Sequence, residues 1–199
     1  MRIGRRPPIS NSRHRRNDMK VIEERDVAHV GEKTCTFRTD DIENSAEYRA
    51  AYEQALNVIS AEDQPFEHSP DGLIKHLVHE KMGTREHCVD AYMLFLAEQT
   101  RSGKHRHMWE EVVFVAEGAG YDLHWDLKFD CIDAYQWDWE TEPKKSEWQR
   151  GDFIYIPPFS IHQHFNTGAG EARLIVINNR IVKAMGFNWL DQVENAPGF

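Results

Sequence analysis

The stretch GKHRHMWEEVVFVAEG, residues 103–118, decides the fold of this chain. Two histidines one residue apart, His105 and His107, precede Glu111, and a run of β-forming residues follows. Side chains at alternate positions of a strand lie on the same face of a sheet. One face of this segment therefore carries two imidazoles, the indole of Trp109 and a carboxylate, followed by aliphatic side chains. Imidazoles with a carboxylate are ligand types that suit a divalent first-row metal.

A second stretch, GDFIYIPPFSIHQHFN at residues 151–166, supplies two more histidines. Residues 153–156 are apolar at every position and predict a buried strand, which the two following prolines end because proline cannot continue the strand pairing. His162 and His164 then share one face of the next strand. If both histidine-bearing strands face one interior, four imidazoles and Glu111 converge there. The two stretches together predict a metal site.

Length and charge indicate one globular domain with extensions. The chain has 199 residues, of which 40% are hydrophobic, which is enough to bury a core. The first 20 residues hold seven Lys or Arg and one Asp, and we predict a flexible basic arm over residues 1–39. The net charge is −9, so the remainder carries about −15. An acidic body argues against nucleic acid as a partner.

Cysteine usage and apolar runs bear on the compartment. Cys35, Cys88 and Cys131 form an odd count without a C-x-x-C pair, which favours three free thiols in the core and a reducing, cytoplasmic environment. No run of 18 apolar residues occurs, and the basic start is not followed by an apolar segment of signal-peptide type. We therefore expect neither a membrane span nor secretion.

The rest of the chain predicts one helix followed by β structure. Helical spacing of Ala, Tyr and Leu after Asn44 and Ser45 predicts a helix over about residues 45–59, within a helical extension at residues 40–69. DGLIKHLVHEKM, residues 71–82, suits a short helix or a strand equally well. Short apolar runs between turn-forming residues then indicate an all-β barrel or sandwich over residues 70–185. Residues 186–199 are expected to be a C-terminal packing tail.

The segment YDLHWDLKFD, residues 121–130, alternates in polarity. Its apolar members share one parity, which predicts that they fill the barrel and that Tyr121 and Trp125 line its cavity. The polar members, beginning with Asp122 and His124, are then expected on the opposite face.

The two histidine stretches resemble the motifs of the cupin superfamily, written G-x5-H-x-H-x(3,4)-E-x6-G and G-x5-P-x-G-x2-H-x3-N. The matching residues are His105, His107, Glu111 and Gly118 in the first motif, and Gly151, Pro157, His162 and Asn166 in the second. Two motif glycines are replaced, one by Gln99 and one by Phe159. The resemblance covers residues 70–185 and implies a double-stranded β-helix, or jelly-roll barrel, with an N-terminal helical extension. Because such barrels are often dimeric, we expect a homodimer.

The resemblance also implies a ligand set and an activity. The implied metal ligands are His105, His107, Glu111 and His162. Within the superfamily, the chain is similar to small proteins of the gentisate 1,2-dioxygenase type, in which Fe(II) binds a hydroxylated aromatic acid and O2. That type usually uses three histidines, so the presence of Glu111 is a departure. The implied function is a non-haem Fe(II) dioxygenase acting on a small hydroxylated aromatic acid.

Two other functions stay open. One is a redox-neutral lyase, decarboxylase or isomerase of a small carboxylic acid that uses Mn, Zn, Ni or Fe as a Lewis acid. It requires an acid or base side chain beside the metal and no oxygen consumption. The other is a cupin that binds a ligand without catalysis.

Five further residues are candidates for the site. His164 is expected to orient a ligand or move a proton, although a hydrogen-bonded core histidine is an equal alternative. Tyr121 is the second candidate acid or base. Trp109, Trp125 and Tyr155 are expected to line the substrate pocket, with packing as the alternative for Trp109. Asn166 is expected to support a turn and not to contact the metal.

Overall fold

The computed structural model of the chain describes residues 36–84, 88–130 and 136–199. It divides into two compact units, Met1–Glu47 and Tyr48–Phe199. The helix α1 spans Phe37–Gln54 and confirms the predicted helix, although it begins and ends earlier than expected. Thr36 directly precedes it, and its carbonyl accepts a hydrogen bond from the Asp40 amide at 2.8 Å. The basic arm predicted for residues 1–39 lies outside the described residues except at its end, where α1 begins.

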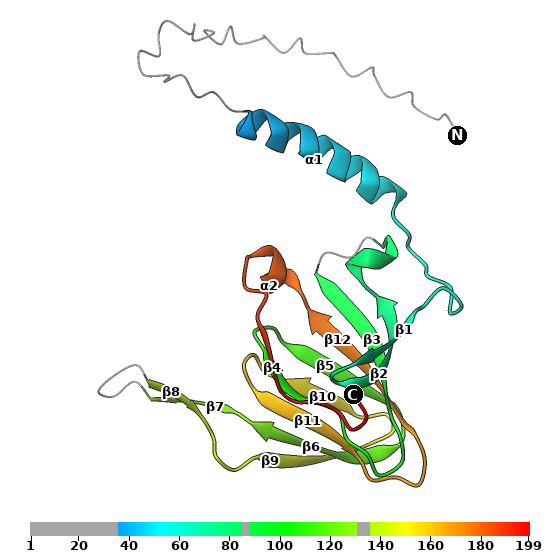
Figure 1. Ribbon diagram of the computed structural model, residues 1–199, viewed down its shortest axis with the longest axis vertical. Helices are drawn as coiled ribbons and strands as arrows, with labels where there is room; N and C mark the ends of the chain where they lie inside the picture. Colours follow the sequence, from blue (N-terminus) through cyan, green and yellow to red (C-terminus); the bar gives the residue numbers. More distant parts are fainter. Residues whose placement is uncertain (1–35, 85–87, 131–135) are drawn as a thin grey trace, which may run out of the picture. The chain divides into compact units, whose positions relative to one another are not determined.

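Two antiparallel sheets form the barrel (Figure 1). The larger sheet has the order β1-β2-β3-β12-β5-β10. Its strands are β1 (Phe66–Ser69), β2 (Gly72–Val78), β3 (Val89–Leu96), β5 (Glu111–Glu117), β10 (Phe153–Ile156) and β12 (Ala172–Asn179). Because β12 lies between β3 and β5, strands distant in sequence are neighbours. This crossover is what a jelly roll requires.

The smaller sheet has the order β13-β4-β11-β6-β9. Its strands are β4 (Lys104–His107), β6 (Ala119–Trp125), β9 (Lys144–Gln149), β11 (Ile161–Asn166) and β13 (Leu190–Glu194). A hairpin of β7 (Leu127–Asp130) and β8 (Gln136–Trp139) extends away from the barrel in Figure 1. The short helices η2 (Glu80–Met82) and α2 (Ile181–Ala184) complete the described elements. The all-β jelly-roll fold with an N-terminal helix is therefore confirmed.

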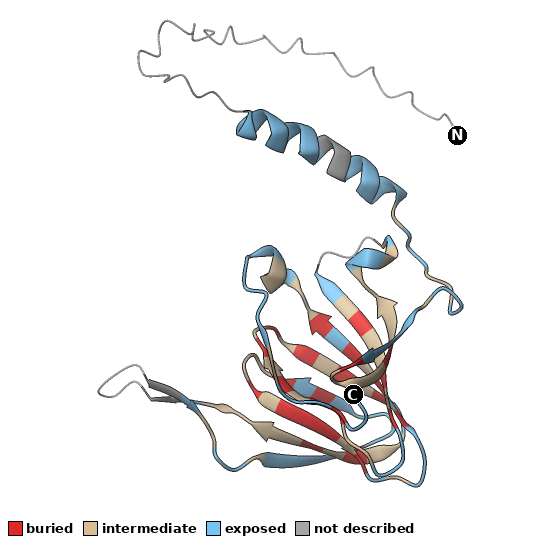
Figure 2. Ribbon diagram, viewed as in Figure 1, coloured by how far each residue is buried: buried red, intermediate tan, exposed pale blue. Residues whose placement is uncertain are grey.

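The core lies between the sheets. Along β12, inward Leu174 and Val176 are fully buried and alternate with more exposed neighbours, as Figure 2 shows. Val113 of β5 and Ile156 of β10 belong to the same core cluster and are equally buried. Burying each such side chain contributes roughly 1.5–3 kcal/mol. The apolar half of the barrel interior holds the two sheets together, and the polar half forms the site described below.

The ambiguous segment at residues 71–82 is a strand followed by one turn of 3-10 helix. β2 pairs with β1 on one side and with β3 on the other. His79 caps η2 by accepting a hydrogen bond from the Lys81 amide at 3.1 Å, and Gly83 ends it with a left-handed φ of 68°. Because β2 pairs with a strand on each side, this part of the segment is a strand and not the helix that its apolar pattern also allowed.

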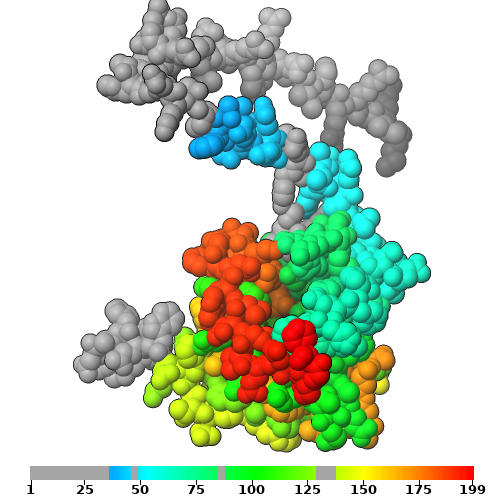
Figure 3. Space-filling view, viewed as in Figure 1, coloured from blue at the N-terminus to red at the C-terminus, as the bar shows by residue number. Residues whose placement is uncertain are grey.

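The barrel extends beyond the residues predicted for it. β1 precedes residue 70, and β13, within the predicted packing tail, pairs with β4. The chain after β12 lies over the near face of the barrel in Figure 3, and β13 lies directly beside two histidines of β4, with Gln192 opposite His105. The tail is therefore part of the wall of the site. None of the described helices is long and apolar enough to cross a membrane.

One buried-thiol prediction is wrong. Cys88, which was expected in the core, is an exposed free cysteine. Cys35 and Cys131 lie outside the described residues.

Within residues 121–130, the face assignment is wrong for the part that forms β6, because β6 is turned the other way. Asp122 is fully buried, whereas Tyr121 lies on the outer face, stacked on Phe165 at 4.7 Å between ring centroids. Asp122 faces inward because two buried donors meet its Oδ1, His164 Nδ1 at 2.8 Å and Trp148 Nε1 at 2.8 Å. A buried carboxylate with charged or polar partners can replace an apolar residue at an interior position.

The two replaced motif glycines are the two described non-glycine residues with positive φ. Gln99 has φ of 56° and Phe159 has φ of 65°. This left-handed region favours glycine and costs other residues about 1 kcal/mol or more. Local bonds hold both residues in place: Gln99 Nε2 donates to the Thr167 carbonyl, and the Phe159 amide donates to the His107 carbonyl at 2.7 Å. The backbone expected for the motifs is thus kept without the glycines.

A substitution of Gly120 by alanine is expected to destabilise the barrel. A Cβ there would lie 1.8 Å from the Phe165 carbonyl oxygen and 2.7 Å from the Trp148 ring, so β6 and β11 would have to separate. Overpacking of this kind costs about 1–3 kcal/mol. Urea denaturation of Gly120→Ala beside Gly170→Ala, whose Cβ meets nothing within 4 Å, measures the difference. Equal stability of the two variants would contradict the close approach of β6 and β11.

Candidate metal centre

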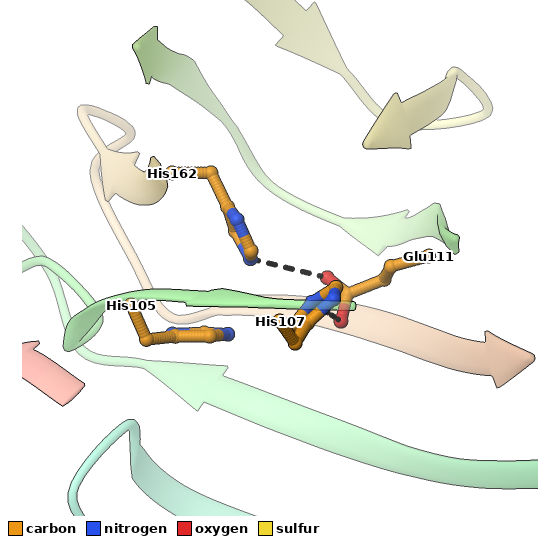
Figure 4. Close-up of side chains that lie close together, drawn as sticks. All are labelled: His105, His107, Glu111 and His162. Atoms are coloured by element: carbon orange, nitrogen blue, oxygen red, sulfur yellow. Dashed lines mark ion pairs between the residues drawn. The ribbon is translucent and has the colours of Figure 1, made fainter. Parts of the chain in front are cut away.

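Four side chains from three strands meet inside the barrel (Figure 4). His105 and His107 come from β4, Glu111 begins β5, and His162 lies on β11 directly opposite His105. One ligand atom from each lies within 4.8 Å of the others, and all four residues are buried. We call these four residues the His–Glu cluster. The structure brings together the four residues that the resemblance to the cupin motifs implied as ligands.

Two imidazoles of the cluster are held in one orientation by the main chain. His107 Nδ1 donates to the Trp109 carbonyl at 2.8 Å, and His162 Nδ1 donates to the Ser160 carbonyl at 3.0 Å. Each bond leaves Nε2 as the free nitrogen and fixes the ring, as is usual for metal-binding histidines.

The free atoms of the cluster face one another without hydrogen bonds. His107 Nε2 is 3.3 Å from Glu111 Oε2, and His162 Nε2 is 3.8 Å from Glu111 Oε1. Among the described groups, neither Nε2 atom nor Glu111 Oε1 has a hydrogen-bond partner. Burying such atoms without a partner costs about 1–3 kcal/mol each. A cation at the centre would satisfy them together, so the donor set fits a divalent metal.

His162 is suited to metal binding by its protonation state. Burial lowers its pKa well below the ordinary value, and the neighbouring rings of His105 and His107 lower it further. A neutral imidazole keeps the lone pair that binds a metal.

Asp71 supports His105 from the loop before β2. Asp71 Oδ1 lies 2.9 Å from His105 Nδ1, which leaves Nε2 of that ring for the cluster. Burial opposes charge on both groups, but their mutual attraction prevails, raising the pKa of His105 and lowering that of Asp71. The sequence analysis did not identify Asp71 as a site residue, because a single acidic residue in a turn belongs to no recognisable motif.

His164 lies beside the cluster and is paired with Asp122. His164 Nε2 is 3.9 Å from Glu111 Oε1, while Nδ1 bonds to Asp122 Oδ1 at 2.8 Å. Burial disfavours the imidazolium, yet Asp122 and Glu111 raise the pKa of His164 to about 9. The same contact lowers the pKa of Asp122 to about 2 against its burial. His164 is therefore hydrogen-bonded in the interior and lies beside Glu111, and its role in orienting a ligand or moving a proton stays a prediction.

A cavity of about 230 Å³ opens beside the cluster. Its lining includes His105, His107 and Glu111, together with Trp109. The Trp109 indole stacks on the His107 ring at 4.6 Å with 1° between the planes, so it is at once packing and cavity wall. The volume is below the roughly 300–1,000 Å³ of pockets for drug-sized ligands. Only a small molecule would fit.

Tyr92 and Asn178 complete a polar group in this cavity. Asn178 Oδ1 accepts from Trp109 Nε1 at 3.0 Å, and Asn178 also hydrogen-bonds Tyr92. Burial, with the negative charges of Glu111 and Asp71, raises the pKa of Tyr92 well above 10. The phenol therefore stays protonated. Sequence analysis missed Tyr92 because it sits in an apolar strand with no polar pattern.

Three predicted site residues lie elsewhere. Tyr155 is 58% exposed, because on β10 only Ile154 and Ile156 face inward. Trp125 packs under Lys104, whose Nζ is 3.7 Å from the ring centre, and does not line the cavity. Tyr121 lines a separate hollow of about 530 Å³ on the outer face of β6. The reversed orientation of β6 accounts for Tyr121 and Trp125.

Asn166 has the turn-supporting role expected of it. Its Nδ2 donates to the carbonyls of Leu96, Ala97 and Gly170, and its Oδ1 accepts from the Gly168 amide. It therefore ties β11 to the end of β3 and does not contact the cluster.

No family model matches this chain, and no curated protein is similar enough to it to count as a match. Solved structures do match. An oxalate decarboxylase is 13% identical with a TM-score of 0.50, over 66% of this chain and 30% of that one. A polyketide cyclase from Streptomyces resistomycificus is 15% identical with a TM-score of 0.46, over 62% and 79%. An RmlC-like cupin from Shewanella frigidimarina is 13% identical with a TM-score of 0.45, over 63% and 91%.

The chain shares its fold with the oxalate decarboxylase structure, and the strand order of its two sheets is that of a jelly roll. It spans less than a third of the oxalate decarboxylase chain. At these identities the likeness concerns the fold alone, and one fold carries many functions. The function therefore depends on the residues of the site.

Proposed function

We propose that this protein is a metal-dependent enzyme whose divalent metal is bound by the His–Glu cluster. The observation that carries the proposal is the convergence of four buried ligand atoms within 4.8 Å, several of them without hydrogen-bond partners. When bound, the metal would supply Lewis acidity, and four protein ligands in an octahedral shell leave two positions for substrate. Sites that keep open positions are typical of catalytic rather than structural metals.

The residues around the cluster can serve a substrate in distinct ways. Tyr92 presents a protonated phenol to the cavity and can donate a hydrogen bond. His164, held by Asp122, places Nε2 3.9 Å from Glu111. Trp109 supplies a flat apolar wall. The cavity thus combines polar groups near the ligands with an aromatic surface, which suits a small organic acid.

As the specific reaction we propose oxidation or ring cleavage of a small hydroxylated aromatic acid by O2 with Fe(II). Support comes from the resemblance of both histidine motifs and from the size and aromatic wall of the cavity. Oxygen uptake by anaerobically iron-loaded protein, offered a panel of dihydroxybenzoates, tests this. We expect one O2 consumed per substrate, and none with His162→Ala. Failure of every dihydroxybenzoate to cause oxygen uptake above that variant would contradict the dioxygenase assignment.

A redox-neutral lyase, decarboxylase or isomerase is the second candidate. It is favoured by the polar side chains beside the cluster, because Tyr92 and His164 are the acid or base groups that such chemistry needs. Turnover of a small carboxylic acid at an unchanged oxygen concentration would select this candidate over the first.

A further inference from the structure

We infer that Arg180 is the anchor for the substrate's carboxylate in the cavity beside the metal ligands. The inference rests on the proposed function and names the substrate's recognition group. Arg180 directly follows β12 and lines the same cavity as the His–Glu cluster. Among the described residues that line it, Arg180 is the sole Lys or Arg.

The guanidinium is held in one position by three neighbours. Its Nε lies 3.1 Å from Asp90 Oδ2, and its Nη2 donates to Asn188 Oδ1 at 2.8 Å. Its Cζ lies 4.2 Å from the centre of the Trp109 ring, a cation–π distance. A positioned side chain loses little further entropy when it binds a ligand.

These contacts leave donors for a ligand. A guanidinium carries five N–H groups, of which one on Nη2 is hydrogen-bonded to Asn188, while Nε forms an ion pair with Asp90 without a hydrogen bond. Nη1 has no hydrogen-bond partner among the residues that the structure describes. The remaining edge, with hydrogens on both Nη atoms, matches the two oxygens of a carboxylate in a pair of parallel bonds.

Trp109 connects the anchor to the metal ligands. The same indole contacts Arg180 and stacks on His107, and its Nε1 is fixed by Asn178 at 3.0 Å. The distance between a bound carboxylate and the cluster is therefore set by one buried, rigid side chain. A small acid would have its carboxylate at Arg180 and its reacting group at the metal.

Benzoate and its neutral isostere benzamide are the probes that test this. Both are titrated into zinc-loaded and metal-free protein, with the NMR signal of the Trp109 indole N–H reporting on the cavity. Wild type should bind benzoate at least about tenfold more tightly than benzamide, the effect of a charge-assisted bond. Arg180→Gln should lose about tenfold or more in benzoate affinity and keep its benzamide affinity, and Arg180→Lys should lose less. The matched control is Arg173→Gln, which changes an exposed arginine of β12 and should bind as wild type.

The outcomes separate this inference from the metal proposal. Equal affinity of wild type for the two probes, or benzoate binding by Arg180→Gln within twofold of wild type, would overturn the anchor. Should Arg180→Gln unfold by circular dichroism, the wild-type preference and Arg180→Lys still decide. Failure of the cluster to hold zinc, measured on the same samples, would refute the metal proposal while leaving the metal-free titration to report on Arg180.

Discussion

Replacing His162 with alanine is expected to abolish stoichiometric metal binding while the barrel stays folded. The variant removes one of four ligands and leaves the other three too few to retain the metal through purification, so content should fall from about one metal per chain to less than about a tenth. His105→Ala should behave in the same way. Elemental analysis of protein purified without added metal gives the content, and circular dichroism reports the fold.

The matched control is His68→Ala, an exposed histidine of β1 outside the cluster. It should retain the wild-type metal content. Unchanged content in both His105→Ala and His162→Ala would show that the ligand set is wrong.

Replacing Asp122 with alanine is expected to cost about 3–5 kcal/mol of unfolding free energy, the range for removing one partner of a buried ion pair. The substitution leaves His164 and the Trp148 indole N–H without their acceptor inside the barrel. Urea denaturation of the metal-free protein near pH 7 measures the loss. The exposed Glu147 on the adjacent strand β9 is the control, and Glu147→Ala should unfold at the wild-type midpoint.

This comparison also tests the direction in which β6 faces. If Asp122 lay on the solvent face, as the alternating pattern of residues 121–130 predicted, its loss would be as mild as that of Glu147. Stability of Asp122→Ala equal to the control would therefore refute the interior carboxylate.

The ligand set could be predicted from the sequence because strand geometry acts locally. Two histidines at alternate positions must share a face, and a motif fixes the spacing to Glu111. What joins the two stretches is the pairing of β11 with β4, which places His162 opposite His105. The convergence of the two stretches on one metal was inferred from the resemblance to the cupin motifs, because the local pattern does not show which strands pair.

The remaining site residues could not be predicted because their partners are distant in sequence. Polar and apolar residues alternate along β6. The prediction placed the apolar residues inside the barrel, which is the wrong face. The true orientation is set by His164 and Trp148, which supply a buried carboxylate with hydrogen bonds. Asp71 is likewise identified only by its contact with His105, and Arg180 only by the cavity.

Gln99 and Phe159 show the opposite case, in which a departure from the motif changed little. Both hold the left-handed backbone that glycine would adopt there, because neighbouring carbonyls and amides fix them. The motif therefore describes a backbone path as much as a set of residue types.

Anomalous diffraction from crystals of the metal-loaded protein, recorded at the absorption edge of the metal found by elemental analysis, tests the central claim most directly. We expect one strong peak inside the barrel, within bonding distance of His105, His107, Glu111 and His162. A peak elsewhere, or four side chains without a metal among them at full loading, would contradict it.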